Sequence, residues 1–95
     1  MADAEFRLEE TETGGRYVLA VDGYEAEMTF SNAGTGKIII DHTGVPKELG
    51  GRGIGTQLLA HVVDNVRAKG LKVIPLCPFV KAQLEKHTEW QDIRN

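Results

Sequence analysis

The first third of the chain alternates apolar and polar residues with a period of two, which is typical of β-strands that bury one face. Residues 6–8 and 16–21 follow this pattern, and a turn-like stretch at 11–15 separates them. Asp22-Gly23 then stands between the second strand and a third alternating segment, 24–30. Because Asp-Gly between such segments is a strong signal for a two-residue turn, we expect its flanking strands to form a hairpin.

A fourth strand is predicted at residues 37–43, after a turn at 31–36. The triplet Ile38-Ile39-Ile40 does not alternate, so we expect this strand to be covered on both faces. The four strands together predict an N-terminal antiparallel meander.

The pattern changes at Gly44. Residues 44–53 hold four glycines and Pro46, too many for a regular element. An apolar stripe with helical spacing follows, made of Ile54, Leu58, Leu59, Val62, Val63 and Val66. This stripe predicts a helix over residues 54–69, ended by Gly70.

The C-terminal part predicts a fifth strand at residues 71–76, stopped by Cys77-Pro78. A short helix is expected at residues 80–87, and the tail that contains Trp90 and Ile93 is assigned no element. Strands followed by a strand–helix–strand unit indicate the α/β (more narrowly α+β) class. We expect residues 1–95 to form a single small domain, because so short a chain has room for one continuous core.

Composition excludes several classes of protein. A net charge of −3 gives no general affinity for nucleic acid or anionic membranes, and the longest aliphatic run is far too short to span a bilayer. Cys77 is the one cysteine, so no intramolecular disulfide can form. The N-terminus lacks the basic and apolar regions of a signal peptide. We therefore expect a cytoplasmic protein that is a monomer or a weak dimer.

The glycine-rich loop at residues 50–56 precedes the predicted central helix. Backbone N–H groups at a helix start lack internal partners, and glycines allow a phosphate to approach them closely. Arg52 adds a cation, so the loop is typical of an anion site. It matches neither a P-loop, since no lysine follows Gly55, nor a dinucleotide fingerprint, since Thr56 holds the third glycine position. A tight connection without a ligand is the alternative.

Three short motifs surround this loop, and in combination they resemble the small GCN5-related N-acetyltransferases of the YjdJ type. They are His42-Thr43-x-Val45-Pro46, Gly51-Arg52-Gly53-Ile54-Gly55 and Leu76-Cys77-Pro78-Phe79-Val80. The resemblance covers residues 4–93 and implies that the chain binds acetyl-CoA. The residues that it implies as cofactor contacts are Thr43, Val45, Gly50, Gly51, Arg52, Gly53, Ile54, Gly55, Thr56, Phe79 and Lys81. Gly50 departs from the family motif, which has Arg or Gln at that position.

The resemblance also implies that the fifth strand splays away from the fourth. The pantetheine arm would pair with the exposed backbone of the gap like an additional strand. The acetyl group would then lie at the C-terminal end of the fifth strand, beside Cys77.

Cys77 and His42 are the candidate catalytic residues. Cys77 lies where a helix N-terminus stabilises a thiolate, and it could accept the acetyl group or protonate the departing CoA thiolate; the alternative is a buried small hydrophobic residue. His42 is a candidate base for the incoming ammonium, or simply a half-exposed strand residue. Glu27 and Glu48 are alternative bases. No residues have metal-ligand spacing.

We therefore expect an acetyl-CoA-dependent N-acetyltransferase that acts on a primary amine: a protein or peptide lysine, a polyamine or a small amine. Larger relatives have two helices near the N-terminus and often a catalytic tyrosine on the helix after the fifth strand. This chain shows no such helices, which implies an open acceptor face, and Gln83 stands where small relatives commonly have the tyrosine. The alternatives are a non-catalytic CoA-binding module and a small interaction domain.

Overall fold

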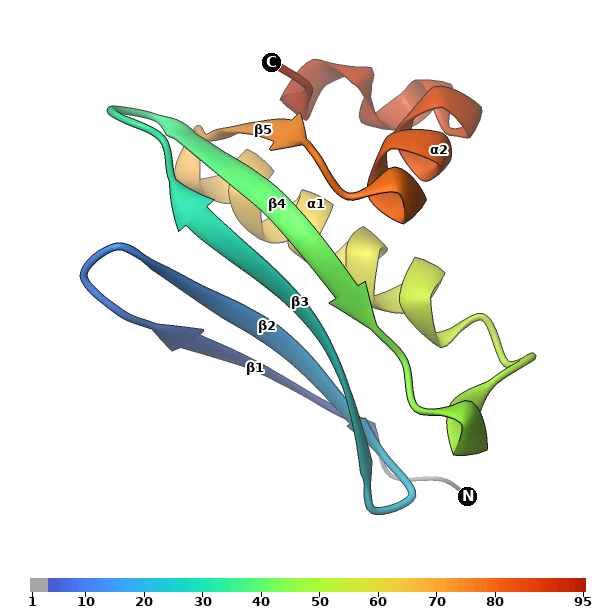
Figure 1. The fold of residues 1–95 in the computed structure, drawn as a ribbon. Coiled ribbons are helices and arrows are strands. Elements are labelled where there is room, and N and C mark those ends of the chain that lie inside the picture. Colours follow the sequence, from blue (N-terminus) through green and yellow to red (C-terminus); the bar gives the residue numbers. More distant parts are fainter. Residues whose placement is uncertain (1–3) are drawn as a thin grey trace.

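A computed structural model describes residues 4–95, which form a five-stranded sheet in the order β1-β2-β3-β4-β5 (Figure 1). The strands are β1 (Ala4–Glu10), β2 (Gly14–Val21), β3 (Tyr24–Asn32), β4 (Lys37–Gly44) and β5 (Lys72–Pro75). The first four pair antiparallel with their sequence neighbours, and β5 joins β4 in parallel. This arrangement confirms the predicted meander and the α+β class.

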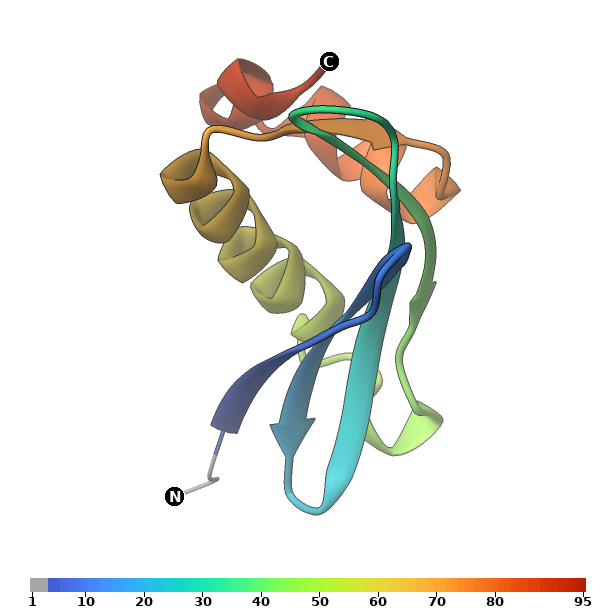
Figure 2. The same cartoon turned by 90° about the vertical axis from the view of Figure 1, so that its left-hand side faces the viewer.

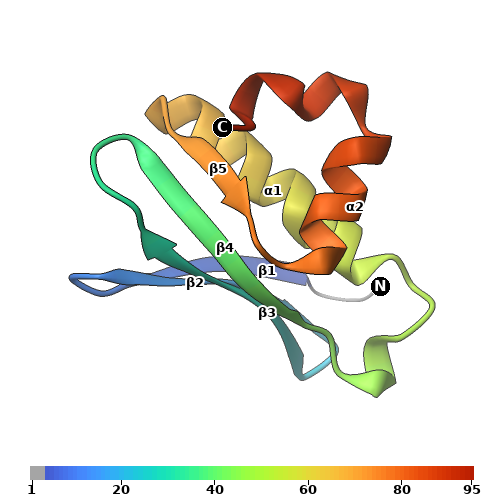
Figure 3. The same ribbon diagram turned by 45° about the horizontal axis from the view of Figure 1, so that its top comes forward.

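Two α-helices and two short 3-10 helices complete the described chain. They are η1 (Lys47–Leu49), α1 (Ile54–Lys69), α2 (Pro78–Lys86) and η2 (Thr88–Ile93). Helix α1 connects β4 to β5 and lies along one face of the sheet, as the edge-on view in Figure 2 shows. Helix α2 lies beside α1 at the β5 end of the sheet (Figure 3).

The core lies between α1 and the sheet. All six residues of the predicted helical stripe are buried, and they join alternate side chains of the strands, Tyr17, Leu19, Ala26, Met28 and Phe30 among them. Each fully buried aliphatic side chain of this kind contributes about 1.5–3 kcal/mol. The sheet and α1 therefore depend on each other for stability, because neither could bury its apolar face alone.

The β2–β3 hairpin has the two-residue turn that the sequence predicts. Asp22 has φ 53° and Gly23 has φ 82°, and Val21 pairs with Tyr24 on either side of them. Positive φ at both central residues is the type I′ turn, whose twist matches that of the flanking strands.

The turn-like stretch at 11–15 is shorter than predicted, because Gly14 and Gly15 belong to β2. A Cβ on Gly14 would lie 2.2 Å from the Phe30 carbonyl oxygen, and one on Gly15 would lie equally close to that of Glu9. These glycines thus allow close backbone approach within the sheet. The sequence indicated a turn because glycine is common both in turns and at points of close backbone approach within a sheet, and the pattern does not distinguish the two.

The C-terminal tail, for which no element was predicted, forms η2. Trp90 and Ile93 are buried in it, and the Trp90 ring stacks on His87 with centroids 4.1 Å apart. Six residues are too few for a period to show in the sequence. Other differences are small: α2 begins two residues earlier than expected, at Pro78, and Ile39 is half-buried where both faces of β4 were expected to be covered.

The Tyr17 hydroxyl makes the free energy of unfolding depend on pH in the alkaline range. It donates a hydrogen bond of 2.7 Å to Asn65 Oδ1, and burial, helped by the charge of Glu10, raises its pKa to about 12 from an ordinary 10.0. The unfolded chain therefore loses this proton at lower pH than the folded one does. Between pH 10 and 12 the unfolded state binds fewer protons, so the free energy of unfolding falls as pH rises.

We expect Tyr17→Phe to remove this loss of stability at high pH. The full loss, reached once the tyrosine is ionised in both the folded and the unfolded state, is about 2–3 kcal/mol in the free energy of unfolding. Urea unfolding at pH 8, 10 and 11 measures it. Tyr24→Phe is the matched control, because Tyr24 is 42% exposed. Equal slopes for the parent chain and Tyr17→Phe would contradict the assignment.

Candidate functional site

Strands β4 and β5 pair only briefly and then separate. Their parallel register runs from Lys37 with Lys72 to Ile40 with Pro75, after which β4 continues to Gly44 paired with β3 but not with β5. The carbonyl oxygen of Ile40 accepts the N–H groups of both Leu76 and Cys77, at 3.1 and 3.0 Å. Beyond this double contact the chain turns away into α2 (Figure 3), which confirms the predicted splay.

A β-bulge lies at the same place on β4. Phe30 pairs with Ile40 while the preceding Thr29 pairs with His42, so Asp41 is the extra residue. Thr29 Oγ1 donates a hydrogen bond to the Asp41 carboxylate. Bulges redirect the side chains that follow them. Here the bulge sets the register of the last three residues of β4, those that run beside the open gap.

Cys77 faces the gap from the helical side. Its Sγ lies 3.4 Å from Thr43 Oγ1, and Thr43 pairs with the buried Met28. The cysteine is 5% exposed, and its carbonyl oxygen accepts the Lys81 N–H at 2.9 Å as the N-cap residue of α2. The structure therefore brings two predicted site residues, Cys77 and Thr43, into contact.

His42 lies on the other face of β4. It is exposed, and the position that a Cβ on Gly44 would take is 3.3 Å from its Nε2 atom. Glu27 borders the same position, with its Oε2 atom at 3.8 Å. The two candidate catalytic residues are thus separated by the strand itself, and each faces its own side of the gap.

The glycine loop has the backbone conformation that its composition suggests. Gly51 and Gly53 have φ values of 74° and 68°, in the left-handed region that other residues rarely adopt. Gly53 is the N-cap of α1, with no side-chain hydrogen bond to the first turn and no acidic residue in it. The first N–H groups of α1 therefore lack a side-chain acceptor, as an anion site requires.

Arg52 has a partner that the sequence did not indicate. Its Nη1 atom lies 2.9 Å from Asp22 Oδ2, at the tip of the β2–β3 hairpin, with both side chains just over 40% exposed. Arg52 therefore crosses from the loop to the hairpin. Asp22 was identified only as a turn residue, because nothing in a sequence brings positions thirty residues apart together.

Phe79 and Gly55 fix the beginning of α1 against that of α2. A Cβ on Gly55 would lie 2.9 Å from Phe79 Cζ, which is too close for any real contact. Among the other expected contacts, Ile54 is buried, Thr56 is half-buried, and Val45, Gly50 and Lys81 are exposed. The glycine at position 55 thus allows the Phe79 ring to pack against the start of α1.

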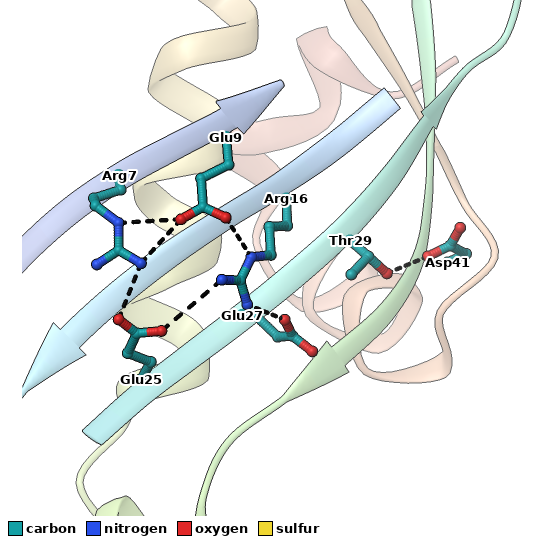
Figure 4. Close-up of polar contacts among 7 residues, drawn as sticks. All are labelled: Arg7, Glu9, Arg16, Glu25, Glu27, Thr29 and Asp41. Carbon is teal, nitrogen blue, oxygen red and sulfur yellow. Dashed lines mark hydrogen bonds and ion pairs between the residues drawn. The ribbon is translucent and has the colours of Figure 1, made fainter. Parts of the chain in front are cut away.

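The outer face of the sheet carries a network of ion pairs (Figure 4). Arg16 lies between Glu9 and Glu27, with contacts of 2.7 Å to each, and Arg7 bridges Glu9 and Glu25. The guanidinium groups of Arg16 and Arg7 hold the pKa of Glu9 below its usual value. Each side chain is between 33 and 45% exposed, so no further layer covers this face.

No group of His, Cys, Asp or Glu side chains within residues 4–95 is arranged to hold a metal ion. A lipid bilayer would need a longer and more apolar helix than any that this part of the chain forms.

A sheet with a bulged strand, an open strand pair and a glycine loop at the start of a helix defines the class of this α+β protein. A model of the GCN5-related N-acetyltransferase family matches residues 16–93. A GCN5-like protein from Staphylococcus aureus, solved in solution by NMR, is 37% identical over 94% of this chain and 87% of its own, with a TM-score of 0.72. A search of curated proteins found no match.

The chain therefore belongs to the GCN5-related N-acetyltransferase family, and it is an acetyltransferase by family and fold. Proteins of this family generally use acetyl-CoA as the acetyl donor. Both expectations of the sequence, the family and the enzyme class, are confirmed.

Gly55→Ala should destabilise the protein, since the added methyl group displaces Phe79 or separates the two helices. We expect a loss of about 1–3 kcal/mol in the free energy of unfolding, the usual cost of overpacking. Combining it with Phe79→Leu should restore most of the loss. Thr56→Ala, one residue further along α1, is the control for substitution at the helix start. A Gly55→Ala chain as stable as the Thr56→Ala chain would contradict this packing.

Proposed function

We propose that this protein transfers the acetyl group of acetyl-CoA to a primary amine across the gap beside β4. The observation that carries the proposal is the placement of Cys77 and His42 on opposite sides of one strand, where its partner strand has ended. A thioester and an amine approaching from the two sides would meet along residues 41–44, at the edge of β4 that β5 no longer covers.

The residues of the loop fit the phosphates of the cofactor. The N–H groups at the start of α1 face no carboxylate of their own turn, and the left-handed glycines keep side chains away from them. Arg52 supplies a cation beside the loop. Its five N–H donors would either bind Asp22 and a phosphate together, or leave Asp22 in order to bind the phosphate. Lys81, exposed on α2, is a second cation for the phosphates.

Bound acetyl-CoA would supply a thioester to the gap. His42 would take a proton from the amine, so that a neutral nitrogen attacks the acetyl carbon. The new N–C bond replaces the C–S bond, and the Cys77 thiol would give its proton to the departing sulfur. The nitrogen then loses its second proton through water, which restores the proton of the Cys77 thiolate and leaves a neutral amide. Direct acceptance of the acetyl group by Cys77 is the other route that this placement allows.

A non-catalytic CoA-binding module is the second candidate. It is favoured by Gly50, where the family motif has Arg or Gln, and by the engagement of Arg52 with Asp22. Both features reduce the positive charge available to the phosphates, while leaving the backbone donors in place.

The two candidates differ in turnover but share cofactor binding. We expect added CoA to shift the amide resonances of residues 50–56, and incubation with acetyl-CoA and a panel of primary amines to release free thiol. Shifts without thiol release across the panel would support the module. An absence of shifts at millimolar CoA would overturn both candidates.

Replacing Cys77 by Ala tests its part in the reaction. Loss of a proton donor should lower kcat by a factor of about 10²–10⁴ and leave the dissociation constant of CoA within a few-fold. Cys77→Ser, which keeps a donor of similar size, should retain more activity than Cys77→Ala. Thermal unfolding of both variants controls for the packing of this buried side chain. An unchanged kcat in Cys77→Ala would remove it from the mechanism.

A further inference from the structure

The outer edge of β1 carries backbone groups that no strand of residues 4–95 covers. This strand is the first in the order of the sheet, and β2 is its one partner there (Figure 1). The opposite edge of the sheet differs, because Arg94 pairs with Val73 of β5 and the Asn95 N–H donates to the Val73 carbonyl at 2.9 Å. The chain thus closes one edge of its sheet itself and leaves the other open.

The direction of the backbone groups along β1 follows from one hydrogen bond. Thr11, directly after the strand, donates its N–H to the Gly14 carbonyl at 2.8 Å, toward β2. The register of the two strands is unbroken, and the backbone groups alternate in direction from residue to residue. The odd-numbered residues of β1 therefore bond to β2. The even-numbered ones direct their N–H and C=O groups out of the sheet: Ala4, Phe6, Leu8 and Glu10.

This strand lacks several features that keep an edge strand unpaired. Proline, lysine and a bulge are among the usual ones, and Ala4–Glu10 has none of them. On its inner face Phe6 is 41% exposed, and its ring stacks on His61 of α1 with centroids 4.1 Å apart. An apolar ring thus lies at the open edge, supported from behind by α1. The strand is suited to pair with a further strand.

The charges on the outer face of β1 decide which strand fits. Glu5, Arg7 and Glu9 alternate in sign along that face. Arg7 contacts Glu9 and Glu25 through its Nε and Nη2 atoms, and neither contact uses Nη1 (Figure 4). Glu5 is exposed. A strand that places a cation opposite Glu5 and a carboxylate opposite Arg7 is therefore favoured, and an antiparallel second copy of β1 does both.

We propose that two copies of this chain pair antiparallel through β1, with Phe6 opposite Phe6 of the second copy on a two-fold axis. Glu5 then lies opposite Arg7 of the second copy, and Ala4 lies opposite Leu8. Because the outward-pointing residues face each other, the two backbones exchange hydrogen bonds at these positions. The two sheets become one continuous sheet, with an isologous contact between the copies.

Charge and polarity exclude the neighbouring registers. An axis at Arg7 would place Arg7 opposite itself and Glu5 opposite Glu9, and like charges directly opposite each other destabilise a strand pair. An axis at Leu8 would place Phe6 opposite Glu10, whose carboxylate binds Lys69 at 3.4 Å. The axis at Phe6 pairs unlike charges on the outer face and apolar side chains on the inner face.

The test is sedimentation equilibrium of the full chain between about 10 µM and about 1 mM, because interfaces below about 1,200 Å² are weak and reversible. We expect a monomer–dimer equilibrium. Amide hydrogen exchange should slow with rising concentration far more at Phe6 and Leu8 than at Arg7. Glu5→Arg should raise the dissociation constant tenfold or more, since it opposes like charges at two symmetric positions. Glu85→Arg is the matched control, an equal charge change at an exposed position on α2, and should stay within twofold.

Exchanging the charges between copies tests the register itself. Arg7→Glu should also weaken the dimer, whereas a mixture of Glu5→Arg and Arg7→Glu chains has unlike charges at both positions. We expect the mixture to associate at least tenfold more tightly than either variant alone. Thermal unfolding checks each variant, because Arg7 also binds Glu25. If Arg7→Glu does not fold, the effect of Glu5→Arg and the exchange pattern decide.

A chain that stays monomeric up to about 1 mM would overturn the proposal and leave the open edge to an extended segment of another protein. Association that Glu5→Arg leaves unchanged or strengthens would also overturn it, as would a mixture that binds no more tightly than its components. Each of these results is independent of acetyl transfer.

Discussion

The short pairing of β4 with β5 is the constraint on which the rest of the site depends. The ladder ends at Pro75, and the Ile40 carbonyl then accepts two successive N–H groups, those of Leu76 and Cys77. A single acceptor that closes the pairing in this way turns the chain out of the sheet plane and into α2. The last residues of β4 are left without a neighbour on that edge, and an unpaired edge within a well-packed sheet is ready to bind an extended ligand.

The side chains beside the end of β4 differ in chemistry between the two faces of the sheet. On the side of the helices the neighbours are a buried thiol, a threonine hydroxyl and the start of α1. On the outer side they are carboxylates, guanidinium groups and an imidazole, all in contact with solvent. The ion pairs of the outer face contribute little to stability individually because they are exposed. Their main consequence is geometric, since each guanidinium fixes the direction of the carboxylates around it.

Periodicity in the sequence predicted most of the fold. The alternation of Tyr24, Ala26 and Met28, the Asp22-Gly23 turn and the stripe that begins at Ile54 all carry a local signal, and the structure confirms each. The elements that were missed have no such signal. Trp90 and Ile93 lie in a single short 3-10 helix, and Gly14 is required by the nearby Phe30 carbonyl, which a strand pairing brings to it.

The sequence by itself predicted the family, which is confirmed. It also indicated the loop before α1 as a candidate anion site, and Cys77 and His42 as candidate catalytic residues. Only the tertiary structure decided that these two lie on opposite faces of β4, that Arg52 is bound to Asp22, and that the side chains of Glu27 and His42 both approach Gly44. The physical reason is that a side-chain pattern reports local conformation. Strand register and the bulge at Asp41, which bring distant residues together, follow from pairing across the whole sheet.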